Sequence, residues 1–381
     1  MGINGGAEVG FGRVVDVFRD NLDSGGDAGA GVTLYVDGRP MVDIWGGVAD
    51  VRTGRPWTED TAAVVFSCTK GILAVCAYLL VQRGELDLDA PVGRYWPEFA
   101  ANGKADIPVR WLLSHRAGLV ALDRDFTLDE VLAWQPVIAA IEAQAPLWEP
   151  GTAHCYHGMT YGWLVGEVIR RITGELPGVF FRNTLGEPLG LRTWIGLPAE
   201  QRDAVAWLEP APDSGEPAQP EHPVIDRAFT MGGAFGFPVA DGEVTFNNPA
   251  IQAAGIPGAA GVSSARGLAR LYAGCVSAID GPALLTPASI GDAIVVRSSG
   301  QELFGRDDSG ARWGTGFMLD SPPWRPMLSD RSFGHDGAGG QLAFADDTFK
   351  VGFAYVNNRM GGPSDERANR LTAAVRSCLT N

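Results

Sequence analysis

The sequence lacks the clusters of basic residues with which proteins bind nucleic acids or anionic membranes. Only three of its 30 basic residues are lysine (Lys70, Lys104 and Lys350), and Lys and Arg nowhere gather into a stripe. The net charge is −15. Proteins that bind phosphate-rich partners neutralise them with basic patches. We therefore expect neither a nucleic-acid partner nor a membrane partner.

Long apolar runs and paired cysteines are also missing. No run approaches the roughly 18 apolar residues of a membrane-spanning helix. The first residues lack the basic start and apolar core of a signal peptide, so we expect a cytoplasmic protein. No two of the five cysteines form a Cys-x-x-Cys pair, which favours reduced thiols over disulfides or a structural zinc. We expect no metal and no organic cofactor.

The pattern of apolar residues predicts strands near both ends of the chain and helices between them. Periodicity and turn residues predict the following elements: a helix at 9–22, a hairpin at 32–45 around Asp37-Gly38, a helix at 67–83 ended by Gly84, helices to about 255, strands near 313–319, 342–345 and 351–356, and a helix at about 365–379. Residues 209–223 are acidic and rich in proline, and we expect them to leave regular structure.

This order of elements predicts one sheet built from both ends of the chain, with a helical domain inserted. We expect residues 1–75 and 256–381 to form the α/β sheet domain. Residues 76–255 are then the mainly helical insertion.

The strongest local motif is Ser67-Cys-Thr-Lys70 at the start of the helix predicted at 67–83. Residues three apart on a helix have Cβ atoms about 5–6 Å from each other, so the amine can reach the hydroxyl. A serine hydroxyl is a weak nucleophile until a base takes its proton, and a desolvated lysine can be that base. Alone, the motif also fits an ordinary N-cap serine beside a solvent-exposed lysine.

Further segments strengthen the catalytic interpretation, because several occur in a set order. They are Leu112–Leu119, Glu149–Tyr156, Tyr161–Gly174, Gly261–Tyr272 and Phe333–Gly340. With the Ser67 motif, they make the sequence resemble the serine β-lactamase-like hydrolases: class C β-lactamases, DD-peptidases and family VIII carboxylesterases. The resemblance implies the β-lactamase/transpeptidase-like α/β (α+β) fold, in which helices flank an antiparallel sheet and a mainly helical domain is inserted.

The resemblance also implies roles for single residues. Ser67 matches the nucleophile, Lys70 its general-base or proton-holding partner, and Tyr156 the tyrosine that relays a proton to the leaving group. Without its Pro-Gly-Thr lead-in, Tyr156 would read as a buried aromatic residue.

A third motif, Lys/His-x-Gly, matches His335-Asp336-Gly337. The resemblance implies that the backbone N–H of Ala338 joins that of Ser67 in an oxyanion hole. Lys350-Val-Gly352 fits the same pattern. We prefer His335 because the glycines after it allow close approach to a ligand, whereas Lys350 starts a predicted strand.

One position departs from the family pattern. Where β-lactamases and DD-peptidases have Tyr-x-Asn, this chain has Tyr156-His157-Gly158. The family's asparagine holds a substrate amide carbonyl, so its absence at Gly158 favours esters over β-lactams and peptides.

Other candidates have weaker support from the sequence. His154 and His157 could suggest a metal, but no third ligand is in view, and we expect local hydrogen bonds. Cys68 lies beside the nucleophile with no base to pair with it, and we expect His115 to pack or to form hydrogen bonds. Five tryptophans could line an apolar acyl pocket, although most should belong to the core: Trp134, Trp148, Trp207, Trp313 and Trp324.

Together these features predict a serine carboxylesterase that acts on a small-molecule ester through an acyl-enzyme. The nearest alternative is an acyltransferase that passes the acyl group to an amine or alcohol. A second is a β-lactamase, or an amidase of the DD-peptidase or D-aminopeptidase type. A third, from another class, is an inactive binding protein, against which the intact Ser67, Lys70 and Tyr156 argue. The sequence does not predict the oligomeric state.

Overall fold

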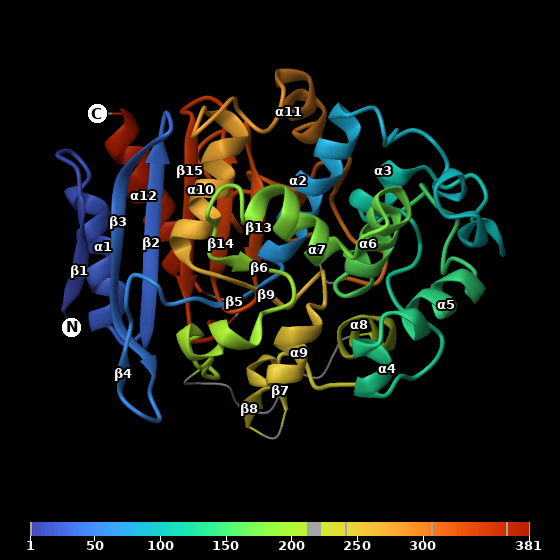
Figure 1. The fold of residues 1–381 in the computed structure, drawn as a ribbon, viewed down its shortest axis with the longest axis horizontal. Helices are drawn as coiled ribbons and strands as arrows, with labels where there is room; N and C mark the ends of the chain where they lie inside the picture. The colour runs from blue at the N-terminus through green and yellow to red at the C-terminus, as the bar shows by residue number, and fades with distance from the viewer. Residues whose placement is uncertain (1, 212–221, 241, 306–307, 363–364, 381) are drawn as a thin grey trace.

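Strands from both ends of the chain form one antiparallel sheet (Figure 1). The computed structural model describes residues 2–211, 222–240, 242–305, 308–362 and 365–380. The strand order is β1-β3-β2-β15-β14-β13-β12-β11-β10, and β4 pairs with β3. Because β2 pairs with β15, the two ends of the chain meet inside the sheet. The strands are β1 (Ile3–Ala7), β2 (Gly29–Val36), β3 (Arg39–Asp50), β4 (Arg55–Pro56), β10 (Ser298–Ser299), β11 (Arg312–Trp313), β12 (Met318–Leu319), β13 (Ser332–Gly337), β14 (Gln341–Asp346) and β15 (Val351–Asn357).

The predicted hairpin is the pair β2 and β3. Asp37 and Gly38 both have positive φ values, 47° and 74°. This is the conformation of a two-residue turn whose twist matches the strands it joins, and it explains why Asp-Gly occurs there.

Helices cover both faces of the sheet. Side chains along a strand alternate between faces, and β14 follows this rule: Leu342 and Phe344 pack with the cluster under α1 and α12, while Ala343 and Ala345 pack with the opposite cluster. Helices α1 and α12 therefore lie on one face, and α10 lies on the other (Figure 1). These helices are α1 (Gly12–Asp23), α10 (Ala265–Val276) and α12 (Arg367–Thr380).

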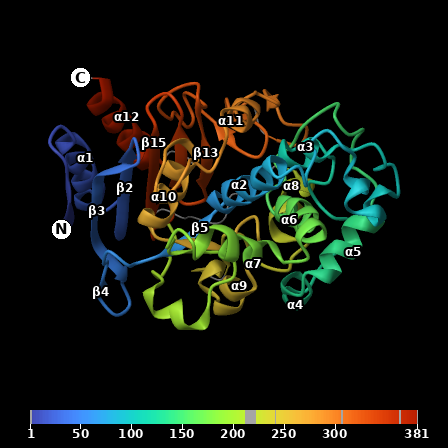
Figure 2. The ribbon, with the colours of Figure 1, turned by 45° about the horizontal axis from the view of Figure 1, so that its top comes forward.

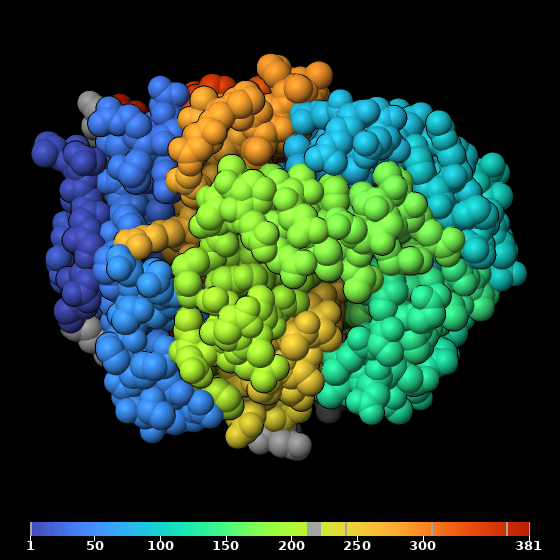
Figure 3. All heavy atoms as spheres, viewed as in Figure 1, coloured from blue at the N-terminus to red at the C-terminus, as the bar shows by residue number. Residues whose placement is uncertain are grey.

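A mainly helical part lies beside the sheet, and α2 (Cys68–Gln82) runs between the two (Figure 2). Space-filling atoms show the chain around α7 spread over the front of the molecule, between α10 and the other helices (Figure 3). The remaining helices are α3 (Val109–Leu113), α4 (Leu128–Leu132), α5 (Gln135–Ala143), α6 (Thr160–Thr173), α7 (Pro177–Phe181), α8 (Pro223–Thr230), α9 (Pro249–Ala254) and α11 (Pro287–Ala293).

Two small sheets were not predicted. One has the order β5-β9-β6, and the other joins β7 to β8. Their strands have two to four residues, too few for a periodic pattern. They are β5 (Ala63–Phe66), β6 (Thr193–Trp194), β7 (Val239–Ala240), β8 (Glu243–Val244) and β9 (Gly261–Ser263).

The predicted fold class is confirmed: an antiparallel sheet flanked by helices, with a mainly helical part between its strands in the sequence. The division at residues 75 and 255 stays a prediction, and α2 runs across the first limit. Of the acidic stretch at 209–223, residues 212–221 lie outside the described residues. Within the described ranges, no helix combines the length and apolar character needed to cross a membrane.

Candidate active site

Ser67 lies at the turn between β5 and α2. Phe66, just before it, has a φ of 45°, which is strained for a residue with a bulky side chain. Thr69 holds this turn: its Oγ1 donates to the Phe66 carbonyl over 2.5 Å and accepts from the Gly261 N–H over 3.0 Å. The turn places the Ser67 hydroxyl at the N-terminal end of α2, and α2 packs against the sheet.

Lys70 and Tyr156 both reach the Ser67 hydroxyl. Lys70 Nζ lies 3.0 Å from Ser67 Oγ and also donates to the Gly258 carbonyl over 2.7 Å. The Tyr156 hydroxyl donates to Ser67 Oγ over 2.8 Å. Lys70 Nζ lies 4.9 Å from the centre of the Tyr156 ring. The structure thus brings together three side chains that are up to 89 residues apart in the sequence.

Burial moves the pKa values of Lys70 and Tyr156 in opposite directions. Desolvation lowers the pKa of Lys70 to about 7, although the charge of Asp336 partly opposes this. A substantial fraction of Lys70 is therefore neutral near pH 7 and able to accept a proton. Burial raises the pKa of the Tyr156 phenol well above its usual value, so the resting phenol keeps its proton.

Histidines around Tyr156 hold its loop. The His157 N–H donates to His115 Nδ1 over 3.2 Å, and the His115 ring packs 4.9 Å from the Tyr156 ring. Both His157 ring nitrogens are used, because Nε2 accepts from the Leu119 N–H and Nδ1 contacts the Cys155 carbonyl. Desolvation lowers the pKa of His157 to about 4, which keeps it neutral. These contacts are the local hydrogen bonds expected for these residues.

The end of β13 lies against the turn that carries Ser67. A Cβ on Gly337 would lie 2.3 Å from the carbonyl oxygen of Val65 in β5, so only glycine permits this approach. Ala338 and Asp336 line the same cavity as Ser67. His335 is buried, and its Nδ1 lies 2.7 Å from the Asp336 carbonyl oxygen. Asp336 Oδ2 lies 3.7 Å from Arg325 Nε.

Lys350 lies away from this cavity. Its side chain is 46% exposed, at the start of β15, and it pairs with Asp347 over 2.6 Å. The glycine of its motif has a packing role, since a Cβ on Gly352 would lie 2.2 Å from the backbone nitrogen of Ala273 in α10.

Gly337→Val is therefore expected to lower kcat by about 10²- to 10³-fold, the loss that follows removal of one oxyanion donor, because the β13 end must move away from β5. Lys350→Ala should change kcat only a few-fold. Steady-state ester kinetics, with circular dichroism to check folding, provide the test. If Lys350→Ala lost most of its kcat while Gly337→Val stayed active, then Lys350-Val-Gly352, and not His335-Asp336-Gly337, would be the catalytic Lys/His-x-Gly motif.

Ser67 opens onto a cavity of about 410 Å³. Two of the five tryptophans, Trp313 and Trp324, line it, and Trp313 stacks on Tyr156 with ring centres 5.1 Å apart. Trp134, Trp148 and Trp207 do not line it. The lining residues are Ser67, His154, Tyr156, Phe229, Phe237, Gly300, Glu302, Gly305, Ser309, Ala311, Trp313, Trp324, Asp336 and Ala338.

Sequence reasoning did not find Phe229, Phe237 and Glu302. No motif marks them. Only the fold brings α8, which carries Phe229, the residues just before β7, which include Phe237, and the residues before β11, which include Glu302, to the catalytic turn. Phe229 explains Gly158: a Cβ at that position would lie 2.6 Å from the Phe229 ring. The ring occupies the space into which an asparagine side chain at 158 would project.

Cys68 is buried, and its thiol donates to the His335 carbonyl over 3.2 Å. Burial raises the pKa of the Cys68 thiol well above its usual value. Its thiolate is therefore scarce, and this environment does not favour a nucleophile. Among the described residues, no group of three or more His, Cys, Asp or Glu side chains is arranged to hold a metal ion.

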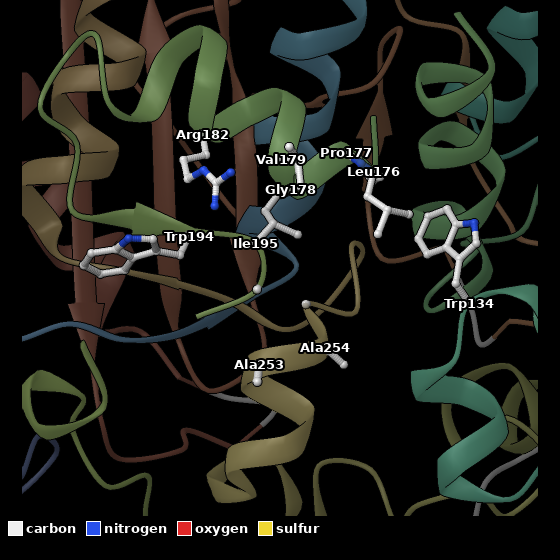
Figure 4. A pocket seen from close by; sticks show the side chains of 12 residues that line it. Trp134, Leu176, Pro177, Gly178, Val179, Arg182, Trp194, Ile195, Ala253 and Ala254 are labelled. Carbon is white, nitrogen blue, oxygen red and sulfur yellow. The ribbon is translucent and has the colours of Figure 1, made fainter. Parts of the chain in front are cut away.

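A second cavity of about 200 Å³ lies apart from Ser67 (Figure 4). Trp194, Ile195 and the helix carrying Arg182 border it on one side, and Trp134 and Leu176 lie toward the other. Arg182 is the one ionisable side chain among the described residues that line it. The described residues that line this cavity include no nucleophile, acid or base suited to catalysis.

Comparisons with known proteins agree on one family. A family model described as Beta-lactamase matches residues 14–377. The chain is 34% identical to esterase/beta-lactamase LipL of Mycobacterium tuberculosis over 374 residues, 94% of this chain and 83% of that protein. A crystal structure of a family VIII carboxylesterase matches with a TM-score of 0.89 at 32% identity, covering 99% of this chain and 100% of that one. A penicillin-binding protein homologue from Caulobacter crescentus matches with a TM-score of 0.88 at 35% identity, covering the same shares.

Proposed function

The chain belongs to the β-lactamase family, and on that premise we propose that it is a serine carboxylesterase acting through an acyl-enzyme on Ser67. The observation that carries the proposal is the convergence of Lys70 Nζ and the Tyr156 hydroxyl on Ser67 Oγ, at 3.0 and 2.8 Å. A nucleophile with both a base and an acid in hydrogen-bond reach is what acyl transfer requires. The names esterase and carboxylesterase among its relatives support the choice of esters.

In the first half-reaction, neutral Lys70 takes the Ser67 proton as Oγ attacks the ester carbonyl carbon. The carbonyl oxygen becomes an oxyanion, which accepts hydrogen bonds from the N–H groups of Ser67 and Ala338. When the tetrahedral intermediate collapses, the bond to the leaving alkoxide breaks, and the Tyr156 hydroxyl donates a proton to that oxygen. Lys70 returns its proton to the tyrosine oxygen.

In the second half-reaction, the Tyr156 and Lys70 pair accepts a proton from water as the water oxygen attacks the acyl carbon. Collapse of the second intermediate breaks the bond to Ser67 Oγ, which recovers a proton and releases the acid. The raised pKa of Tyr156 favours a phenol as the resting proton donor, rather than a standing tyrosinate.

Product analysis tests the proposal. The enzyme should convert p-nitrophenyl esters to free acid, with and without millimolar amine or alcohol. An acyltransferase would share every step up to the acyl-enzyme but form amide or new ester in preference at low acceptor concentration. That result would replace hydrolysis with transfer.

Turnover of β-lactams should be weak. The Phe229 ring occupies the space where the family's asparagine would hold an amide carbonyl, and loss of one such hydrogen bond to the substrate costs about tenfold to a hundredfold in kcat/KM. A chromogenic cephalosporin is therefore expected to give a kcat/KM at least that far below the best p-nitrophenyl ester. Ser67→Ala supplies the background rate. A cephalosporin turned over as fast as the ester would contradict this prediction.

A further inference from the structure

Among the described residues, the cavity beside Ser67 carries one carboxyl group, that of Glu302, without a cationic partner. Asp336 and Glu302 both line the cavity, and none of the described lining residues is Lys or Arg. Asp336 has a cationic partner in Arg325, whose Nε lies 3.7 Å from Oδ2, and His335 Nδ1 lies 3.5 Å from its Oδ1. Glu302 forms no salt bridge with a described residue.

Two groups contact the Glu302 carboxyl, and neither of them carries a positive charge. The Cys155 thiol lies 3.7 Å from its Oε2, and the backbone N–H of Tyr156 also lies close to the carboxyl group. Burial raises the pKa of Glu302, since these two contacts only partly offset desolvation. Glu302 is partly buried. Removing a carboxylate from water without an ionic partner costs free energy, and a cationic group on the substrate would offset that cost.

Aromatic rings form much of the remaining wall. Their faces attract cations, and substituted ammonium groups are recognised in proteins by rings arranged around a cavity. Tyr156 and Trp313 are stacked with a 20° angle between their planes, and Phe229 and Phe237 with 23°. The aromatic residues that line the cavity are Tyr156, Phe229, Phe237, Trp313 and Trp324.

We propose that this cavity binds a substituted ammonium group on the ester, and that Glu302 is the specificity-determining residue that faces it. The inference rests on the proposed function, because the cation would belong to the ester that acylates Ser67. It narrows the substrate to esters with an ammonium group a few bonds from the scissile carbonyl.

Three p-nitrophenyl esters test this inference. Their acyl chains have the same length and end in trimethylammonium, tert-butyl or carboxylate, so the first two differ in charge but hardly in shape. The cationic ester should exceed the neutral one in kcat/KM by about tenfold to a hundredfold, because the quaternary ammonium gains cation–π contacts and attraction to the Glu302 carboxylate. The carboxylate ester should be the poorest of the three.

Two variants of Glu302 test whether the preference for the cationic ester depends on its carboxylate. Glu302→Gln should reduce the ratio of cationic to neutral kcat/KM toward one, and Glu302→Lys should reverse the preference toward the carboxylate ester. Glu200→Gln, an exposed residue outside the cavity, is the matched control and should keep the wild-type ratio. Because each ratio is measured on one sample, partial loss of folded enzyme does not affect it.

The outcomes separate the two proposals. Hydrolysis of all three esters without a cation preference, or a preference unchanged in Glu302→Gln, would overturn the inference and leave the esterase proposal standing. No turnover of any of the three would contradict the proposed function, and the inference with it.

Discussion

Replacing Ser67 with alanine is expected to lower kcat on p-nitrophenyl esters by roughly 10⁴- to 10⁶-fold, because the acyl-enzyme can no longer form. Lys70 and Tyr156 keep their positions in this variant, since Lys70 still donates to the Gly258 carbonyl and the Tyr156 loop is held by His115 and His157. The loss should therefore appear in kcat without a change in melting temperature large enough to indicate unfolding.

Thr69→Ser is a matched variant for this test. It removes one methyl group but keeps the hydroxyl that binds the Phe66 carbonyl and the Gly261 N–H. It should retain most of the activity. If Ser67→Ala kept more than about one hundredth of the wild-type kcat, serine would not be the nucleophile.

Replacing Lys70 with methionine, or Tyr156 with phenylalanine, is expected to lower kcat by about 10²- to 10⁴-fold, the range for lost acid–base help. Methionine approximates the length of the lysine stem, and phenylalanine keeps the ring that stacks on Trp313. Initial rates at saturating ester concentration give the kcat of each variant. A variant with near wild-type turnover would show that its residue does not transfer the proton.

The pH profile separates Lys70 from a merely structural residue. Desolvation lowers the pKa of Lys70 to about 7, and the base form exists above that pKa. Wild-type kcat/KM should therefore rise with pH through about 7 and then level off. In Lys70→Met the residual kcat/KM should no longer rise through pH 7. A packing defect would instead lower kcat/KM at every pH and keep the shape of the profile.

The sequence allowed accurate prediction where local rules decide. Spacing on one helix turn predicted the Ser67 and Lys70 contact, and Asp37-Gly38 predicted a hairpin because only certain residues adopt the left-handed turn. Tyr156 was different, because nothing local separates it from a core aromatic residue. Only the resemblance to the serine β-lactamase-like hydrolases predicted a catalytic role for Tyr156. In the structure its hydroxyl lies 2.8 Å from Ser67 Oγ.

The features that the sequence did not predict depend on contacts between segments that are distant in the chain. Glu302 and Phe229 carry no motif, and each becomes part of the site only because the fold places it beside Tyr156. The small sheet of β5, β6 and β9 escaped prediction for a similar reason, since its short strands are stabilised by one another and not by their own periodicity. Likewise, the packing role of Gly352 emerged only from the approach of α10 to β15.

Covalent trapping tests the acyl-enzyme on Ser67 most directly. The enzyme is treated with a fluorophosphonate or a slowly deacylating ester, its intact mass is measured, and the labelled peptide is sequenced by fragmentation. The account predicts a single adduct per chain, located on Ser67 and absent from Ser67→Ala. Labelling that persists in Ser67→Ala, or that maps to the neighbouring Cys68, would contradict it.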